Sequence, residues 1–233
     1  SRLNDGFVAP DGSLWFGSMD DSEQVQTGAL YRWFQGGLTR QDDGYGVTNG
    51  PCLSPDGRTL YHHDTLKKTV LAFDHADGAI SNRRVFAVTE DGYADGPSMD
   101  AEGVLHVGLF NGWGVARFAP DGTRIGKIDM PVQTVTKAAF GGPDLRDLYM
   151  TTAWLGNADK RAEQPALGGL VSAEPHPLPC AFERQVGAVE EAAHPHEVRL
   201  QRRFAHMQGV RGVEDVDPLL RVQQQPDQGV QPF

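Results

Sequence analysis

Short apolar runs alternate with turn-forming residues along the first two thirds of the chain. Examples are LWFG at 14–17, ALYRW at 29–33 and LYMT at 148–151. Several runs follow Pro-Asp-Gly, in which proline fixes the backbone for a turn and glycine accepts positive φ. Short alternating or wholly apolar runs between such turns predict β-strands. No period of 3.6 residues is evident, so the pattern predicts an all-β fold.

One turn-and-strand motif occurs in four copies. It reads PDGSLWF at 10–16, PDGRTLY at 55–61, AEGVLHV at 101–107 and PDLRDLY at 143–149, with spacings of 45, 46 and 42 residues. Further strands are predicted between the copies, including VLAFD at 70–74 and VARF at 115–118. Several short strands in every 40–50 residues indicate a propeller blade. We therefore expect a β-propeller with about four blades over residues 1–152.

A polar residue precedes the second residue of each copy by seven positions. These residues are Asn4, Asn49, Asp95 and Lys137. Equivalent positions of successive blades surround one axis, so we expect the four side chains to converge at one mouth of the channel. The alternative is that Asn and Asp only form turns here, since glycine follows closely in three copies. Lys137 favours a site, because lysine is a poor turn former.

The residue types in this ring suggest what it binds. Oxygen ligands from Asn and Asp suit a hard cation such as Ca²⁺ or Mg²⁺, and a lysine suits an anionic or polar group of a substrate. A second candidate cluster is His62-His63-Asp64. Neighbouring residues on a strand point to opposite faces, which argues against a metal ion shared by the two histidines.

Several distinctive motifs occur together in the sequence. They are RLNDG at 2–6, WFGSMD at 15–20, TNGP at 48–51, SPDGRTLY at 54–61, ISNRRVF at 80–86, YADG at 93–96, MDAEG at 99–103 and AFGGPDL at 139–145. With these motifs the sequence resembles the gluconolactonase/regucalcin (senescence marker protein) family. The resemblance covers residues 1 to about 178 and is specific because the motifs occur together. The resemblance implies a six-bladed propeller. It also leads us to expect that the N-terminal part of that fold is missing here.

The resemblance also implies an activity, because members of this family hydrolyse sugar lactones with one divalent metal ion in the channel. By motif, the family's metal-binding Asn and Asp correspond to Asn49 and Asp95, and its substrate-contacting Arg and Asn correspond to Arg2 and Asn4. The family's third ligand, a Glu near its N-terminus, has no counterpart in this chain. The metal would polarise the lactone carbonyl or a bound water, with Asp95 as general base. Lys137, which is assigned only from its position within the repeat, would neutralise the developing carboxylate. The metal would be Ca²⁺ or Zn²⁺, with Mg²⁺ and Mn²⁺ as alternatives.

Composition narrows the choice of partners. The 233 residues carry a net charge of −10, which argues against nucleic acid or an anionic membrane as the main partner. No apolar run approaches the roughly 20 residues of a membrane span. The two cysteines, Cys52 and Cys180, form no disulfide framework, so we expect reduced thiols in a cytoplasmic protein. The expected partner is a small-molecule sugar lactone, and the oligomeric state stays open.

The repeat pattern stops near Cys180. Residues 179–233 contain no Asp-Gly turn, and QQQPDQ at 223–228 is nearly of low complexity. We therefore divide the chain into a partial, lactonase-like propeller over 1–178 and an atypical tail over 179–233. The tail is either the product of a frame shift or a disordered extension.

Three functions are open at this point. The ring of polar residues favours a metal-dependent sugar lactonase. The second is a non-catalytic or inactive propeller fragment that binds a ligand or a protein, since propellers serve many functions. The third is a hydrolase of the same fold that acts on another ester, such as an organophosphate or an aryl ester. The acidic segment 20–23 is expected to be a loop, from which Glu23 would approach the substrate.

Overall fold

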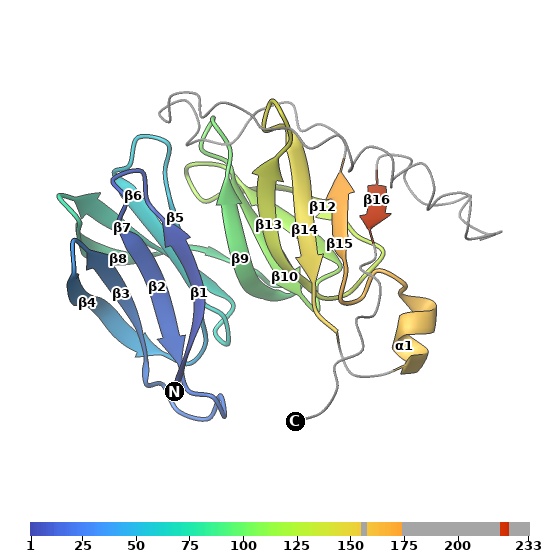
Figure 1. Cartoon of the computed structure of the whole chain (residues 1–233), viewed down its shortest axis with the longest axis horizontal. Helices are drawn as coiled ribbons and strands as arrows, with labels where there is room; N and C mark the ends of the chain where they lie inside the picture. Colours follow the sequence, from blue (N-terminus) through green and yellow to red (C-terminus); the bar gives the residue numbers. More distant parts are fainter. Residues whose placement is uncertain (155–157, 174–219, 224–233) are drawn as a thin grey trace.

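The predicted blades are present as four antiparallel units. The computed structural model describes residues 1–154, 158–173 and 220–223. The first unit consists of β1 (Arg2–Val8), β2 (Leu14–Met19), β3 (Gly28–Phe34) and β4 (Gly37–Tyr45), and the second of β5 (Thr48–Leu53), β6 (Thr59–Asp64), β7 (Thr69–Ala76) and β8 (Ala79–Val88). The third consists of β9 (Tyr93–Met99), β10 (Leu105–Phe110), β11 (Gly114–Phe118) and β12 (Arg124–Asp129). These boundaries confirm the all-β propeller fold (Figure 1).

The fourth blade contains strands from distant parts of the chain. It begins with β13 (Val135–Gly141) and β14 (Asp147–Thr152), continues after the short helix α1 (Ala158–Glu163) with β15 (Leu170–Ala173), and ends with β16 (Leu220–Gln223). β16 pairs antiparallel with β15. Apart from β16, the predicted tail lies outside the described residues, so the proposed division of the chain stays a prediction. Within the described part, no helix is long and apolar enough to cross a membrane.

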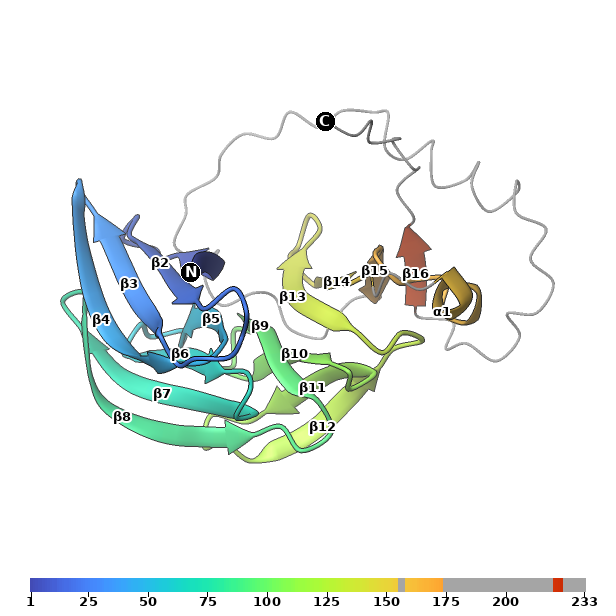
Figure 2. The same ribbon diagram turned by 90° about the horizontal axis from the view of Figure 1, so that it is seen from below.

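The first strand of each blade faces a common space. Figure 2 shows β1, β5, β9 and β13 on the inner side of the fan of blades. The third and fourth blades are joined directly, because β9 and β13 pair in parallel at Gly96 and Lys137. The inner strands therefore follow one another around the axis in chain order, as the repeat predicts.

The Asp-Gly turns explain why the motif recurs. Asp11 accepts hydrogen bonds from the backbone and the hydroxyl of Ser13, at 2.9 and 2.6 Å, and the Ser13 hydroxyl in turn accepts from Trp15 Nε1 at 3.0 Å. The following Gly12 has a φ of 82°, which glycine adopts without strain. Each turn thus fixes the entry of the second strand of its blade.

Neighbouring blades pack through equivalent rows of apolar residues. In the second blade, Leu53, Leu60 and Phe73 are cross-strand partners and are at most 2% exposed. They form one cluster with residues of the first blade, including Trp15 and Leu30. The third blade has an equivalent buried row that packs on the second blade, made of Met99, Leu105 and Phe118.

The corresponding row of the first blade is exposed. Its members are Val8, Leu14 and Trp33, which are 64%, 36% and 46% exposed and pair with one another in the same register. Leu38, the partner of Trp33, continues the row and is 59% exposed. The same structural position therefore lies in a core in two blades and on the surface in the first.

This difference predicts unequal costs for one substitution. Leu60→Ala should lower the free energy of unfolding by about 2–5 kcal/mol, because it leaves a cavity between two blades. Leu14→Ala at the equivalent exposed position should cost less than about 1 kcal/mol. Urea unfolding of both variants would measure the difference. Equal costs would contradict the description and would mean that the first blade's face is covered in solution.

Candidate functional site

All four inner strands carry an irregularity where the ring of polar residues lies. In each strand the pairing register with the next strand shifts, which marks a β-bulge. A bulge bends the strand and redirects side chains, and bulges are frequent next to active sites. The shifts fall between Leu3 and Gly6, between Asn49 and Cys52, between Ala94 and Pro97, and between Val135 and Lys137.

The amide groups of Asn4 and Asn49 meet, as the repeat phase predicts. Asn4 Nδ2 donates to Asn49 Oδ1 at 2.9 Å and to the Thr48 carbonyl at 2.6 Å. Asn49 Nδ2 donates to Thr65 Oγ1 at 2.9 Å, and Thr65 donates to the Ala94 carbonyl at 2.8 Å. This chain of hydrogen bonds links the first three blades and fixes the orientation of the buried Asn49 amide.

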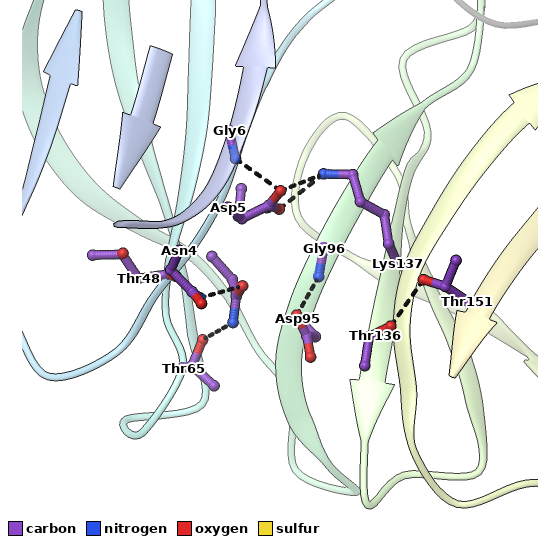
Figure 3. Close-up of polar contacts among 12 residues, drawn as sticks. Asn4, Asp5, Gly6, Thr48, Thr65, Asp95, Gly96, Thr136, Lys137 and Thr151 are labelled. Atoms are coloured by element: carbon purple, nitrogen blue, oxygen red, sulfur yellow. Dashed lines mark hydrogen bonds and ion pairs between the residues drawn. The ribbon is translucent and has the colours of Figure 1, made fainter. Parts of the chain in front are cut away.

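Asp5 is a central residue of the site that the sequence analysis missed. Its two carboxylate oxygens each lie 2.8 Å from Lys137 Nζ, and they also accept hydrogen bonds from the backbone N–H groups of Gly6 and Gly50 at 2.8 and 3.0 Å. Strict alternation would place Asp5 on the face of β1 opposite to Asn4. The bulge removes that alternation, so both side chains reach neighbouring inner strands, Asn4 on β5 and Asp5 on β5 and β13 (Figure 3).

Asp95 is the half-buried carboxylate of the ring. One of its oxygens accepts a hydrogen bond from Gly96 N at 2.9 Å. Burial, and secondarily the negative charge of Asp5, raise the pKa of Asp95 to about 7, although the Gly96 N–H and the Lys137 ammonium oppose this rise. A carboxylate with such a pKa can accept a proton near neutral pH.

Arg2 lies at the exposed edge of the ring. Its Nη1 donates to Asn4 Oδ1 at 2.7 Å, and its Nε lies 3.2 Å from Asp21 Oδ1 in the acidic loop. Glu23 of that loop is exposed, and its backbone N–H donates to the Asp20 carbonyl. The structure thus brings Arg2 to the ring through Asn4 and places the acidic loop beside Arg2.

The donor set fits a hard divalent cation in part. Asn49 Oδ1 and the Asp95 carboxylate are the oxygen groups that Ca²⁺ and similar ions bind, whereas Asp5 is neutralised by Lys137. Among the residues that the structure describes, no group of three or more His, Cys, Asp and Glu side chains is arranged to hold a metal ion. A cation held by Asn49 and Asp95 would therefore need further oxygen ligands.

The two adjacent histidines of β6 are core residues. Both are fully buried, and His62 packs edge-on against the Tyr45 ring at 4.9 Å. Within the described residues neither ring nitrogen of His62 has a hydrogen-bond partner. Burial lowers the pKa of His62 to about 3 and that of His63 to about 4.

These pKa shifts predict acid sensitivity. The folded protein resists protonation of His62, whereas the unfolded chain binds a proton below a pKa of about 6.5, so stability falls as the pH drops through 6.5. Between pH 7 and 5 the loss from this histidine is about 2 kcal/mol. His62→Leu should reduce the measured loss by that amount when urea unfolding is compared at the two pH values. An unchanged loss in the variant would refute the assignment.

Comparison with known protein families identifies the family of this chain. Residues 1–154 match the family described as SMP-30/Gluconolactonase/LRE-like region. The chain belongs to this family, as its motifs suggested.

Relatives from different organisms are similar to this chain. Regucalcin of Danio rerio is 39% identical over 177 residues, which are 72% of this chain and 60% of the relative. A pentonolactonase of Haloferax volcanii is 35% identical over 158 residues, which are 66% and 54% of the two chains. The solved structure of a calcium-binding protein, regucalcin from Agrobacterium tumefaciens, matches with a TM-score of 0.71 at 28% identity and covers 74% of this chain and 61% of its own. The chain thus spans about three fifths of the length of these relatives.

Proposed function

We propose that this chain carries the site of a metal-dependent lactonase that hydrolyses a gluconolactone-like sugar lactone to the aldonic acid. The observation that carries the proposal is the convergence of Asp95 with Asn49 and Lys137 at bulges of successive inner strands. The presence of a pentonolactonase among the relatives supports the same class of substrate. A sugar lactone offers several hydroxyl groups and one ester, which a ring of amides and charges can bind.

In the proposed reaction, Arg2 and Asn4 bind the substrate and Asp95 transfers the proton. Arg2 and Asn4, which are hydrogen-bonded to each other, would hold sugar hydroxyls. Asp95 removes a proton from the attacking water while the water oxygen forms a bond to the lactone carbonyl carbon. When the intermediate collapses, the bond from that carbon to the ring oxygen breaks, and the ring oxygen leaves as a hydroxyl group with the proton that Asp95 accepted.

Asn49 and Asp95 would hold one divalent cation, Ca²⁺ or Zn²⁺, with Mg²⁺ and Mn²⁺ as alternatives. When bound, such an ion polarises the lactone carbonyl or lowers the pKa of a bound water. The hydrogen bond from Asn4 holds the Asn49 amide in place, since Asn49 Oδ1 is the acceptor. A cytoplasmic location and the absence of nucleic-acid and membrane partners stay predictions.

A substrate panel tests this proposal. Acid release would be followed with D-glucono-1,5-lactone, an arabinolactone, p-nitrophenyl acetate and paraoxon, with each metal ion and after chelation. We expect acceleration above the spontaneous rate for the sugar lactones only, and its loss on chelation. Preference for the aryl ester or the organophosphate would favour the other hydrolase. A lack of acceleration with every substrate and metal would favour a non-catalytic or inactive propeller.

A further inference from the structure

The route of the Lys137 side chain toward the axis is fixed by a glycine. Lys137 on β13 pairs with Gly96 on β9, next to Asp95. A Cβ atom at Gly96 would lie only 2.8 Å from both Cγ and Cδ of Lys137. The aliphatic part of Lys137 therefore occupies the space that a side chain on β9 would fill, and its ammonium group is carried past Asp95 (Figure 3).

Asp5, on the first blade, binds the ammonium group of Lys137, which lies on the fourth blade. Both carboxylate oxygens contact Lys137 Nζ at 2.8 Å, and each also accepts one backbone N–H. The Asp5 side chain is 17% exposed and that of Lys137 is 35% exposed. With four contacts to three segments of the chain, Asp5 is a rigid anchor.

An ammonium group has three N–H donors, and the Asp5 carboxylate takes two of them. In the described part of the chain, Asp5 supplies all the hydrogen bonds of Lys137 Nζ. One donor is therefore left for a ligand beside Asp5. A donor fixed in a partly buried site stabilises developing negative charge strongly, because it need not reorient during the reaction.

We propose that Lys137 is a catalytic residue that donates this remaining hydrogen bond to the oxyanion of the lactone, and that Asp5 is the positioning residue that aims it. The inference rests on the proposed lactonase function. Water addition to the carbonyl carbon moves one electron pair onto the carbonyl oxygen, and the water proton passes to Asp95. Lys137 keeps its proton throughout and is released from the oxygen when the ring C–O bond breaks.

The test compares single and double variants in the lactone assay. We expect Lys137→Met to lower kcat by about 10²–10³-fold with a KM change of less than about threefold. Asp5→Asn should lower kcat by about 10-fold or more. Because Asp5 acts through Lys137, Asp5→Asn should have no further effect on kcat in the Lys137→Met background. The matched controls Lys127→Met and Asp43→Asn, which alter surface ion pairs, should retain the normal kcat.

Two results would overturn the inference while leaving the lactonase proposal intact. One is a kcat for Lys137→Met within threefold of the unmodified chain. The other is a multiplicative effect of the two substitutions on kcat, accompanied by a matching loss of stability in urea, which would show that Asp5 acts only by holding the blades together.

A binding measurement tests the proposed role of Lys137 and Asp5 independently of the proposed lactonase activity. D-gluconate, the product anion, would be titrated into the chain and its Lys137→Met and Asp5→Asn variants by calorimetry. In one outcome, the chain hydrolyses no lactone and yet binds gluconate at least 10-fold more tightly than both variants. That result would contradict the lactonase proposal and support binding of an anionic oxygen by the Lys137 ammonium group that Asp5 positions. Absence of both hydrolysis and variant-sensitive binding would overturn the two proposals together.

Discussion

Replacing Asp95 by Asn is expected to lower kcat/KM for a sugar lactone by about 10³-fold. The amide keeps the shape of the side chain and can still accept the hydrogen bond from Gly96 N, so the local fold should survive. It cannot accept a proton from water, and it is a weaker cation ligand than a carboxylate. The initial rate of acid release, measured at saturating metal and corrected for spontaneous hydrolysis, gives the comparison.

A surface aspartate provides the matched control for this substitution. Asp91 pairs with Arg124 on the outside of the third blade, with contacts of 2.7 and 2.8 Å. Asp91→Asn should keep at least half of the activity, because it changes the same functional group away from the ring. If Asp95→Asn retained more than a tenth of the activity, Asp95 would not be the general base.

The second large effect is expected from Asn49→Leu. This change removes an oxygen ligand, and we expect affinity for the divalent cation to fall by at least 10-fold. It also leaves Asn4 Nδ2 and the Thr65 hydroxyl without one partner each, which should cost about 1–3 kcal/mol of stability. Calorimetric titration with Ca²⁺ and Zn²⁺ measures the first effect, and urea unfolding measures the second.

Asn82 offers a control for this variant. It lies on the exposed strand β8 with a φ of 51°, so Asn82→Gly is compatible with the backbone. The control should leave cation binding unchanged. Equal cation affinity in Asn49→Leu and the unmodified chain would exclude Asn49 as a ligand.

The repeat in the sequence was sufficient to predict the blades and the meeting of two ring residues. Turn residues and strand residues follow one another locally in every copy, so the phase of each inner strand could be counted from its turn. That count placed Asn4 and Asn49 at equivalent positions, and the structure shows them hydrogen-bonded. Their roles as substrate-binding and metal-binding groups stay predictions.

The position of Asp5 could not be obtained by the same counting. The repeat phase selects one residue per blade, whereas a bulge brings two consecutive residues to the same side of the strand. A clue was present in Asn4-Asp5-Gly6, since a glycine inside a strand pattern often marks a bulge. The ion pair with Lys137 joins the first and fourth blades, and only the curvature of the whole fan brings those residues together.

The two outer strands of the fourth blade, β15 and β16, also could not be predicted from the local sequence pattern. β15 follows α1 rather than an Asp-Gly turn, so the turn signal that located the other strands is missing. Its partner β16 lies in the segment that was assigned to the tail. Pairing between strands so far apart in the chain depends on the shape of the completed blade and leaves little trace in the local sequence.

A metal titration coupled to activity tests the central claim most directly. Chain depleted of metal by chelation would receive Ca²⁺ or Zn²⁺ in steps while bound metal and the rate of D-glucono-1,5-lactone hydrolysis are both measured. The proposed site predicts that the rate rises in proportion to bound metal and reaches its plateau at one ion per chain, and that Asp95→Asn binds the ion more weakly and reaches a plateau rate about 10³-fold lower. A rate that does not depend on bound metal, or metal binding that is unchanged in Asp95→Asn, would contradict the account.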